Sequence, residues 1–116
     1  MKLVLLMLFL GIFCLNTAFA QDEPVKIDAK EKSQVVDSIA KFMTERYVFP
    51  DKGKEMGDLV LANLKKGDYN EITDPRELAS KLSEDLLTVN NDRHIGVMYM
   101  PERIAMMQAA REDQDR

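Results

Sequence analysis

The chain has 116 residues, with 16 basic and 20 acidic side chains and a formal net charge of −4 at pH 7. A chain of this length buries roughly 60–70% of its unfolded surface, which suffices for one small domain and excludes a typical two-domain hydrolase. The acidic balance argues against a nucleic-acid partner, because phosphate binding requires a basic patch that this sequence does not show.

Residues 1–20 have the pattern of a secretory signal peptide. Lys2 is followed by an apolar run over residues 3–15 and by a small-large-small end, Ala-Phe-Ala, at residues 18–20. The run is shorter than the roughly 18 residues of a spanning helix, so we expect no permanent membrane anchor and export to the periplasm or the extracellular space. The single cysteine, Cys14, lies in this run, so the exported protein has no disulfide or thiolate ligand.

Residues 21–27 form a polar lead-in that we expect to be flexible. Asp28 and Glu31 then have the spacing of a capping box, and apolar residues at helical intervals predict a helix from about Ala29 to Tyr47. Pro50 disfavours helical backbone at the residue before it and is well placed to start a second helix.

The second helix is predicted to end at Gly67. Two glycines four residues apart, Gly53 and Gly57, have two interpretations: a weak first turn, or close packing against the first helix. Asp74 followed by Pro75 is a strong start signal for a third helix, which we expect to fray at residues 89–91.

Residues 95–99 show a strand pattern, since Ile95, Val97 and Tyr99 alternate with less β-favouring residues before Pro101. The predicted fold is therefore mainly α: a small three-helix bundle in residues 28–101, ending in one β-strand, and a C-terminal helix in the tail at residues 102–116. Because an unpaired strand exposes backbone donors and acceptors, we expect the strand Ile95–Tyr99 to pair with a catalytic domain or another subunit.

His94 is the only histidine and stands beside Asp92 at the start of this segment. Two interpretations are open: a residue that titrates near neutral pH and acts as a base, or a structural residue that hydrogen-bonds a turn. We expect no metal or cofactor, because a zinc site needs about three or four ligands. A cluster of methionines, Met98, Met100, Met106 and Met107, is better explained by an adaptable apolar interface than by a copper(I) site.

An ordered set of residues carries a family resemblance. It comprises Val35-Val36 with Ile39, Tyr47-Val48-Phe49-Pro50, Gly67-Asp68-Tyr69, Ile72-Thr73-Asp74, Leu78-Ala79, Leu82, Asp85-Leu86, Asp92-Arg93-His94-Ile95, Val97, Tyr99 and Pro101. With this spacing, nearly all of residues 26–101 resembles the N-terminal helical domain of family S41 serine peptidases. These are the tail-specific and tricorn-like proteases, and the similarity is to the branch related to interphotoreceptor retinoid-binding protein.

The resemblance implies that an α/β catalytic domain follows this domain and supplies a serine nucleophile, in a Ser-Lys or a Ser-His-Ser-Glu arrangement. It makes His94 a candidate general base, only with a catalytic domain present. Arg93 departs from the tricorn-like pattern, which has a serine immediately before that histidine. The tail at residues 102–116 would then begin a linker to a catalytic domain that we expect to be absent from this chain.

We therefore expect an exported, truncated S41-type protein that helps to position a polypeptide substrate and is inactive alone. No serine in the sequence has the strained strand-turn setting of an activated nucleophile. The alternative is a non-enzymatic binding module for an apolar ligand or a protein partner. A fragment of a longer reading frame is a third explanation.

Overall fold

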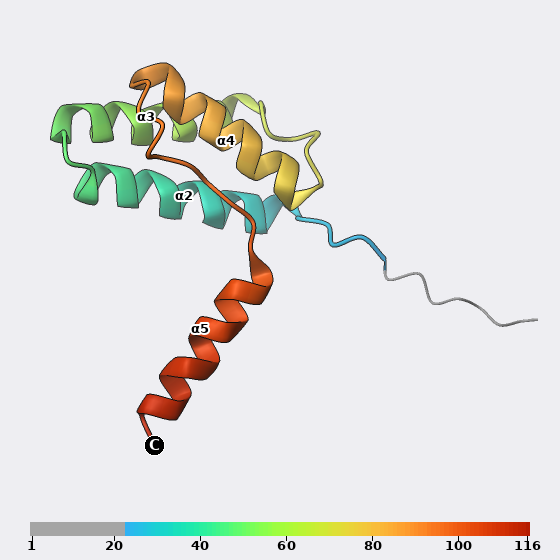
Figure 1. Cartoon of the computed structure of the whole chain (residues 1–116). Helices are drawn as coiled ribbons and strands as arrows, with labels where there is room; N and C mark the ends of the chain where they lie inside the picture. The colour runs from blue at the N-terminus through green and yellow to red at the C-terminus, as the bar shows by residue number, and fades with distance from the viewer. Residues whose placement is uncertain (1–22) are drawn as a thin grey trace, which may run out of the picture.

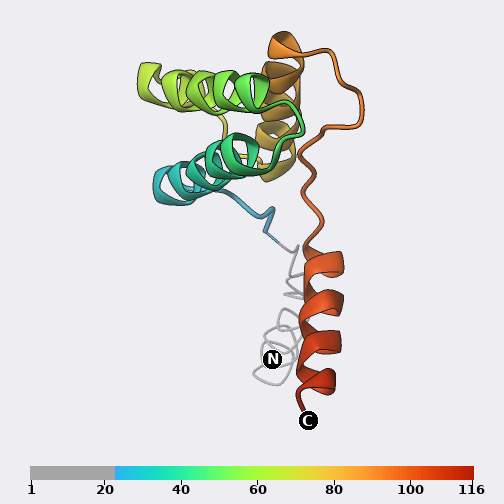
Figure 2. The same cartoon turned by 90° about the vertical axis from the view of Figure 1, so that its left-hand side faces the viewer.

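Four helices make up the part of the computed structural model that is described, residues 23–116 (Figure 1). They are α2 (Ala29–Arg46), α3 (Pro50–Lys66), α4 (Pro75–Val89) and α5 (Pro101–Gln114). Helices α2, α3 and α4 pack together, whereas α5 extends away from them (Figures 1 and 2). Within residues 23–116, no helix combines the length and apolarity needed to cross a membrane. The predicted signal peptide, residues 1–20, lies outside the described residues.

The helix boundaries follow the local signals in the sequence. The Asp28 carboxylate accepts the Glu31 amide at 2.8 Å, and the Glu31 carboxylate accepts the Asp28 amide at 2.9 Å, which confirms the predicted capping box. Asp74 likewise accepts the Arg76 amide at 2.8 Å at the start of α4. Helix α3 ends at Lys66 and is capped by Gly67, whose φ of 89° lies in the left-handed region that favours glycine.

Close packing explains the two glycines of α3. A Cβ atom at Gly57 would lie 2.6 Å from Thr44 Oγ1 and 2.9 Å from the Ala40 carbonyl oxygen, both on α2. A Cβ atom at Gly53 would collide with the Met43 carbonyl oxygen. The missing side chains therefore let the backbones of α2 and α3 approach each other, which supports the second interpretation of the pair.

The core lies between α2, α3, α4 and the loop that joins α3 to α4. Its buried side chains are apolar with one tyrosine: Val36, Ala40, Met43, Met56, Val60, Tyr69, Ile72, Leu78, Leu82 and Leu86. Three of these residues, Leu78, Leu82 and Leu86, recur every four positions on α4, so one face of that helix is buried. Burial of these side chains drives the packing of the three helices.

A buried lysine fastens the loop between α3 and α4. Lys32, on α2, is only 6% exposed, and its ammonium donates to the carbonyl oxygens of Tyr69, Asn70 and Ile72 at 2.9, 3.0 and 2.9 Å. These three bonds satisfy a buried positive charge without a carboxylate. They tie the loop to the first helix of the bundle.

The prediction of a β-strand at residues 95–99 is wrong, because residues 23–116 contain helices and no strand. The segment is irregular backbone, yet its side chains alternate as predicted: Ile95, Val97 and Tyr99 are half-buried, and Gly96 and Met98 are exposed. The alternation arises because one side of the segment packs on the helical core rather than on a sheet. The backbone amide of Val97 has no neighbouring strand in the described residues to bond with and donates a hydrogen bond to the hydroxyl of Ser83, on α4, at 2.8 Å.

The corrected fold class is therefore mainly α with four helices in the described residues. The predicted C-terminal helix is confirmed as α5, and every one of its residues is exposed, including Ile104, Met106 and Met107. Since α5 buries nothing against the bundle, the three-helix core does not depend on it.

Candidate functional site

His94 lies in a tight turn after α4, and the turn is built around the Asp92 carboxylate. Asp92 Oδ1 accepts the His94 backbone amide at 3.0 Å and also lies 3.0 Å from the ring nitrogen Nδ1 of His94. The Ile95 amide donates to the Asp92 carbonyl oxygen at 3.2 Å and closes the turn. Asp92 therefore both caps the turn and contacts the imidazole.

The other oxygen of this carboxylate is held from a distant part of the chain. Tyr47, the C-cap residue that follows α2, donates its hydroxyl proton to Asp92 Oδ2 at 2.9 Å. The side-chain amide of Asn90 in turn donates to the Tyr47 hydroxyl oxygen at 2.7 Å. A connected set of four polar residues, Tyr47, Asn90, Asp92 and His94, thus joins the end of α2 to the turn after α4.

These hydrogen bonds set the charge of the site. The His94 backbone amide, followed by the Tyr47 hydroxyl, lowers the pKa of Asp92 below its ordinary value, so this carboxylate is ionised near neutral pH. Desolvation raises the pKa of Tyr47, and the bond to the Asp92 carboxylate adds to this effect, while the bond from Asn90 opposes it. The tyrosine is therefore a neutral donor to a charged acceptor, which is a strong type of hydrogen bond.

The histidine side chain is 99% exposed, whereas Asp92 behind it is largely covered. Two exposed apolar residues, Val48 and Phe49, lie on the α2–α3 turn next to this network. The rings of Phe49 and Tyr47 meet edge to face with centroids 5.9 Å apart, and Phe49 and Asn90 line the same surface hollow. The imidazole is therefore exposed to solvent, and the surface near it includes the apolar side chains of Val48 and Phe49.

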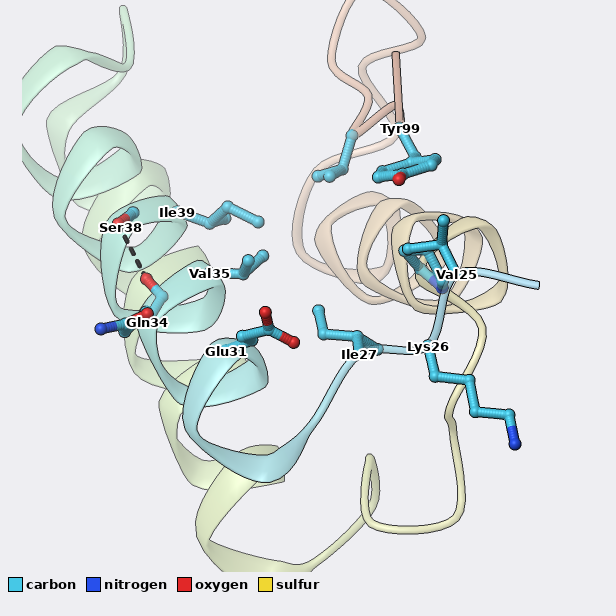
Figure 3. Close-up of a pocket in the computed structure, with 11 residues that line it drawn as sticks. Val25, Lys26, Ile27, Glu31, Gln34, Val35, Ser38, Ile39 and Tyr99 are labelled. Atoms are coloured by element: carbon cyan, nitrogen blue, oxygen red, sulfur yellow. Dashed lines mark hydrogen bonds between the residues drawn. The ribbon is translucent and has the colours of Figure 1, made fainter. Parts of the chain in front are cut away.

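A second feature is an apolar groove of about 570 Å³ between α2 and the segment after the histidine turn. Figure 3 shows Val35 and Ile39 on α2, Val25 and Ile27 in the lead-in, and Tyr99 facing one another across it. The guanidinium of Arg76, on α4, lies 5.4 Å from the centre of the Tyr99 ring. Polar side chains on α2 form the rim: Glu31, Gln34 and Ser38.

The pairing of His94 with Asp92 could be predicted from the sequence because the two residues are close neighbours, whereas the role of Tyr47 and Asn90 could not. Tyr47 and Asp92 are separated by 45 positions, so no spacing rule connects them. The hydrogen bonds of His94 among residues 23–116 go to Asp92 and not to a serine. These residues also contain no group of three or more His, Cys, Asp or Glu side chains that could hold a metal ion.

The fold and the site define a small helical domain with one histidine–aspartate pair on its surface. The chain belongs to the N-terminal domain family of S41 peptidases, since the family model described as the N-terminal domain of Peptidase_S41 in eukaryotic IRBP matches residues 25–116. This match confirms the resemblance drawn from the sequence. No solved structure gives a significant match to the chain.

Proposed function

We propose that this protein is the helical domain of an exported S41-type serine peptidase and acts in proteolysis beside a catalytic domain that supplies the serine. The observation that carries the proposal is the family match over residues 25–116. In this arrangement His94 is the general base and the substrate is a polypeptide.

The exposure of the site supports the need for a second domain. A base acts efficiently in a preorganised, water-excluded site, and the imidazole of His94 is surrounded by solvent here. The catalytic domain, or another subunit, would cover His94 and the exposed pair Val48 and Phe49. It would also contact the open side of the segment Ile95–Tyr99, where Gly96 and Met98 face solvent.

Hydrolysis of unfolded casein tests the part of the proposal that concerns this chain alone. The purified protein should show no turnover, because a nucleophile, a base and oxyanion donors must be assembled together. Turnover that a serine-directed inhibitor abolishes would refute inactivity of the isolated chain.

The mass of the native product tests the rest of the proposal. An antibody against residues 21–116 would recover the protein from its source for intact mass measurement. A product with the mass of a complete peptidase would support an attached catalytic domain, and its activity should then be lost in a His94→Ala variant. Unchanged activity in that variant would exclude His94 as the base.

The apolar groove favours a second candidate function, a module that binds an apolar ligand or a protein partner. Its volume of about 570 Å³ is in the range of small-molecule sites, and its walls are mainly apolar. An environment-sensitive apolar dye should gain fluorescence with the protein, and Val35→Gln should reduce the gain. A monomeric protein that leaves the dye unchanged would refute this second function.

A further inference from the structure

We infer that Asp92 is a positioning residue that holds the His94 imidazole with its proton on Nδ1 and leaves Nε2 as the free basic nitrogen. Only the use of Nε2 as a proton acceptor in peptide hydrolysis rests on the proposed function. The orientation itself follows from the hydrogen bonds of Tyr47, Asn90, Asp92 and His94.

The chemistry of the carboxylate fixes the tautomer. An ionised carboxylate accepts hydrogen bonds and donates none, so a neutral imidazole that is bonded to it must carry its proton on the bonded nitrogen. Asp92 Oδ1 lies 3.0 Å from His94 Nδ1 and 3.0 Å from the backbone amide of the same residue. Because the amide can only donate, it keeps Oδ1 directed at His94, and the ring nitrogen then becomes the second donor.

The second oxygen of the Asp92 carboxylate, Oδ2, is also held by a hydrogen bond. The Asn90 side-chain amide donates to the Tyr47 oxygen at 2.7 Å, which directs the Tyr47 hydroxyl proton toward Asp92 Oδ2 at 2.9 Å. The donors therefore run in one direction from Asn90 through Tyr47 to Asp92. With one oxygen held by Tyr47 and the other by His94, rotation of the carboxylate would break at least one of these bonds.

The hydrogen bonds of Asp92 are better explained by orientation of a basic imidazole than by stabilisation of a turn alone. A turn needs only the bond from the His94 amide to Asp92 Oδ1, and it would form with the ring turned away. The additional contact at Nδ1 is the kind of bond that selects the tautomer and orientation of an imidazole in catalytic and metal sites. It leaves Nε2 on the solvent side, where a docked domain would meet it.

Nitrogen-15 NMR of the purified protein tests the inference directly, because the chain has a single histidine. Ring proton-to-nitrogen correlations would be recorded over a series of pH values and compared on the alkaline plateau, where the nitrogen shifts no longer change. We expect the shift of Nδ1 to be that of a protonated nitrogen and the shift of Nε2 to be that of an unprotonated one. The opposite assignment would overturn the inference, since a solvated imidazole favours the proton on Nε2.

Three variants separate positioning from a structural role. Asp92→Ala should move the population toward the Nε2-protonated form, and Tyr47→Phe should produce a smaller change in the same direction. Asp58→Ala, which removes an exposed carboxylate paired with Lys54 on α3, should leave the tautomer unchanged. If circular dichroism shows that Asp92→Ala does not fold, the tautomer is measured in Tyr47→Phe instead, because that variant removes only one hydroxyl group. A folded variant of Asp92 or Tyr47 with the original tautomer would refute the positioning role.

Discussion

The Tyr69 hydroxyl donates a 2.7 Å hydrogen bond to Asp85 Oδ2 in the interior of the bundle. Asn63 on α3 donates to the same oxygen at 3.0 Å, and Lys81 on α4 pairs with the other oxygen. The carboxylate is only 6% exposed, and a buried charge is tolerated when its partners satisfy it. The bond therefore fastens the loop after α3 to α4.

Loss of the Tyr69 hydroxyl should destabilise the protein. Tyr69→Phe keeps the ring but leaves a buried carboxylate with one donor fewer, so we expect a loss of about 2 kcal/mol in the free energy of unfolding. Urea unfolding followed by circular dichroism measures this loss. Tyr99→Phe, which lies outside the network, should change stability by less than about 0.5 kcal/mol, and equal effects of the two variants would contradict the prediction.

The same carboxylate should make stability depend on pH in the acid range. Burial alone would raise the pKa of Asp85, but hydrogen bonds from Lys81, Tyr69 and Asn63 outweigh it and lower the pKa. The unfolded chain therefore takes up a proton first as the pH falls, and the stability present above the ordinary aspartate pKa of about 3.9 is lost below it.

Asp85→Asn tests this dependence, because the amide does not titrate. The difference in unfolding free energy between wild type and Asp85→Asn should narrow from about pH 6 to about pH 3. The difference between wild type and Tyr99→Phe should stay constant over the same range. A constant difference for Asp85→Asn would show that its carboxylate does not carry the effect.

Lys32→Met should loosen the loop between α3 and α4. The variant keeps an apolar chain of similar length but removes the ammonium from three carbonyl oxygens. Each lost bond to a charged donor is worth roughly 1.5–3 kcal/mol and the desolvation of the ammonium offsets part of the sum, so we expect a net loss of about 2–4 kcal/mol. Lys30→Met, at an exposed position of α2, is the control, and a similar loss there would refute a specific role of Lys32.

Gly53→Ala should push α2 and α3 apart. Alanine favours a helix by about 1 kcal/mol over glycine, but its Cβ atom would collide with a backbone oxygen that cannot rotate away. We expect a net loss of about 2 kcal/mol in thermal or urea unfolding. In Gly96→Ala, the added Cβ atom would meet only Ser83 Oγ at 4.0 Å, so that variant should be tolerated. A neutral Gly53→Ala would contradict the close packing.

Ser83→Ala should release the segment after the histidine turn without unfolding the bundle. The Val97 amide loses its acceptor, so its hydrogen exchange should accelerate about fivefold, which corresponds to about 1 kcal/mol. Exchange in α2 should not change. Ser38→Ala removes a hydroxyl that bonds within α2, so it should leave the Val97 exchange rate unchanged. Equal protection of Val97 in both variants would show that Ser83 does not hold the segment.

The sequence by itself determined the helices, their boundaries and the family. Capping residues, prolines and the apolar period act over three or four positions, so α2, α3 and α4 could be predicted from local signals. The position of His94 beside Asp92 was visible for the same reason. The two residues that hold this pair, Tyr47 and Asn90, could not be identified from the sequence.

Only the tertiary structure decided whether the alternating segment becomes a strand. The pattern of Ile95, Val97 and Tyr99 reports burial on one side, which a helical surface provides as well as a sheet does, whereas a strand also needs backbone partners. The contacts of Lys32 with the loop and of Tyr47 with Asp92 join positions 37 to 45 residues apart. Such contacts depend on how the helices pack, and no local pattern in the chain encodes them.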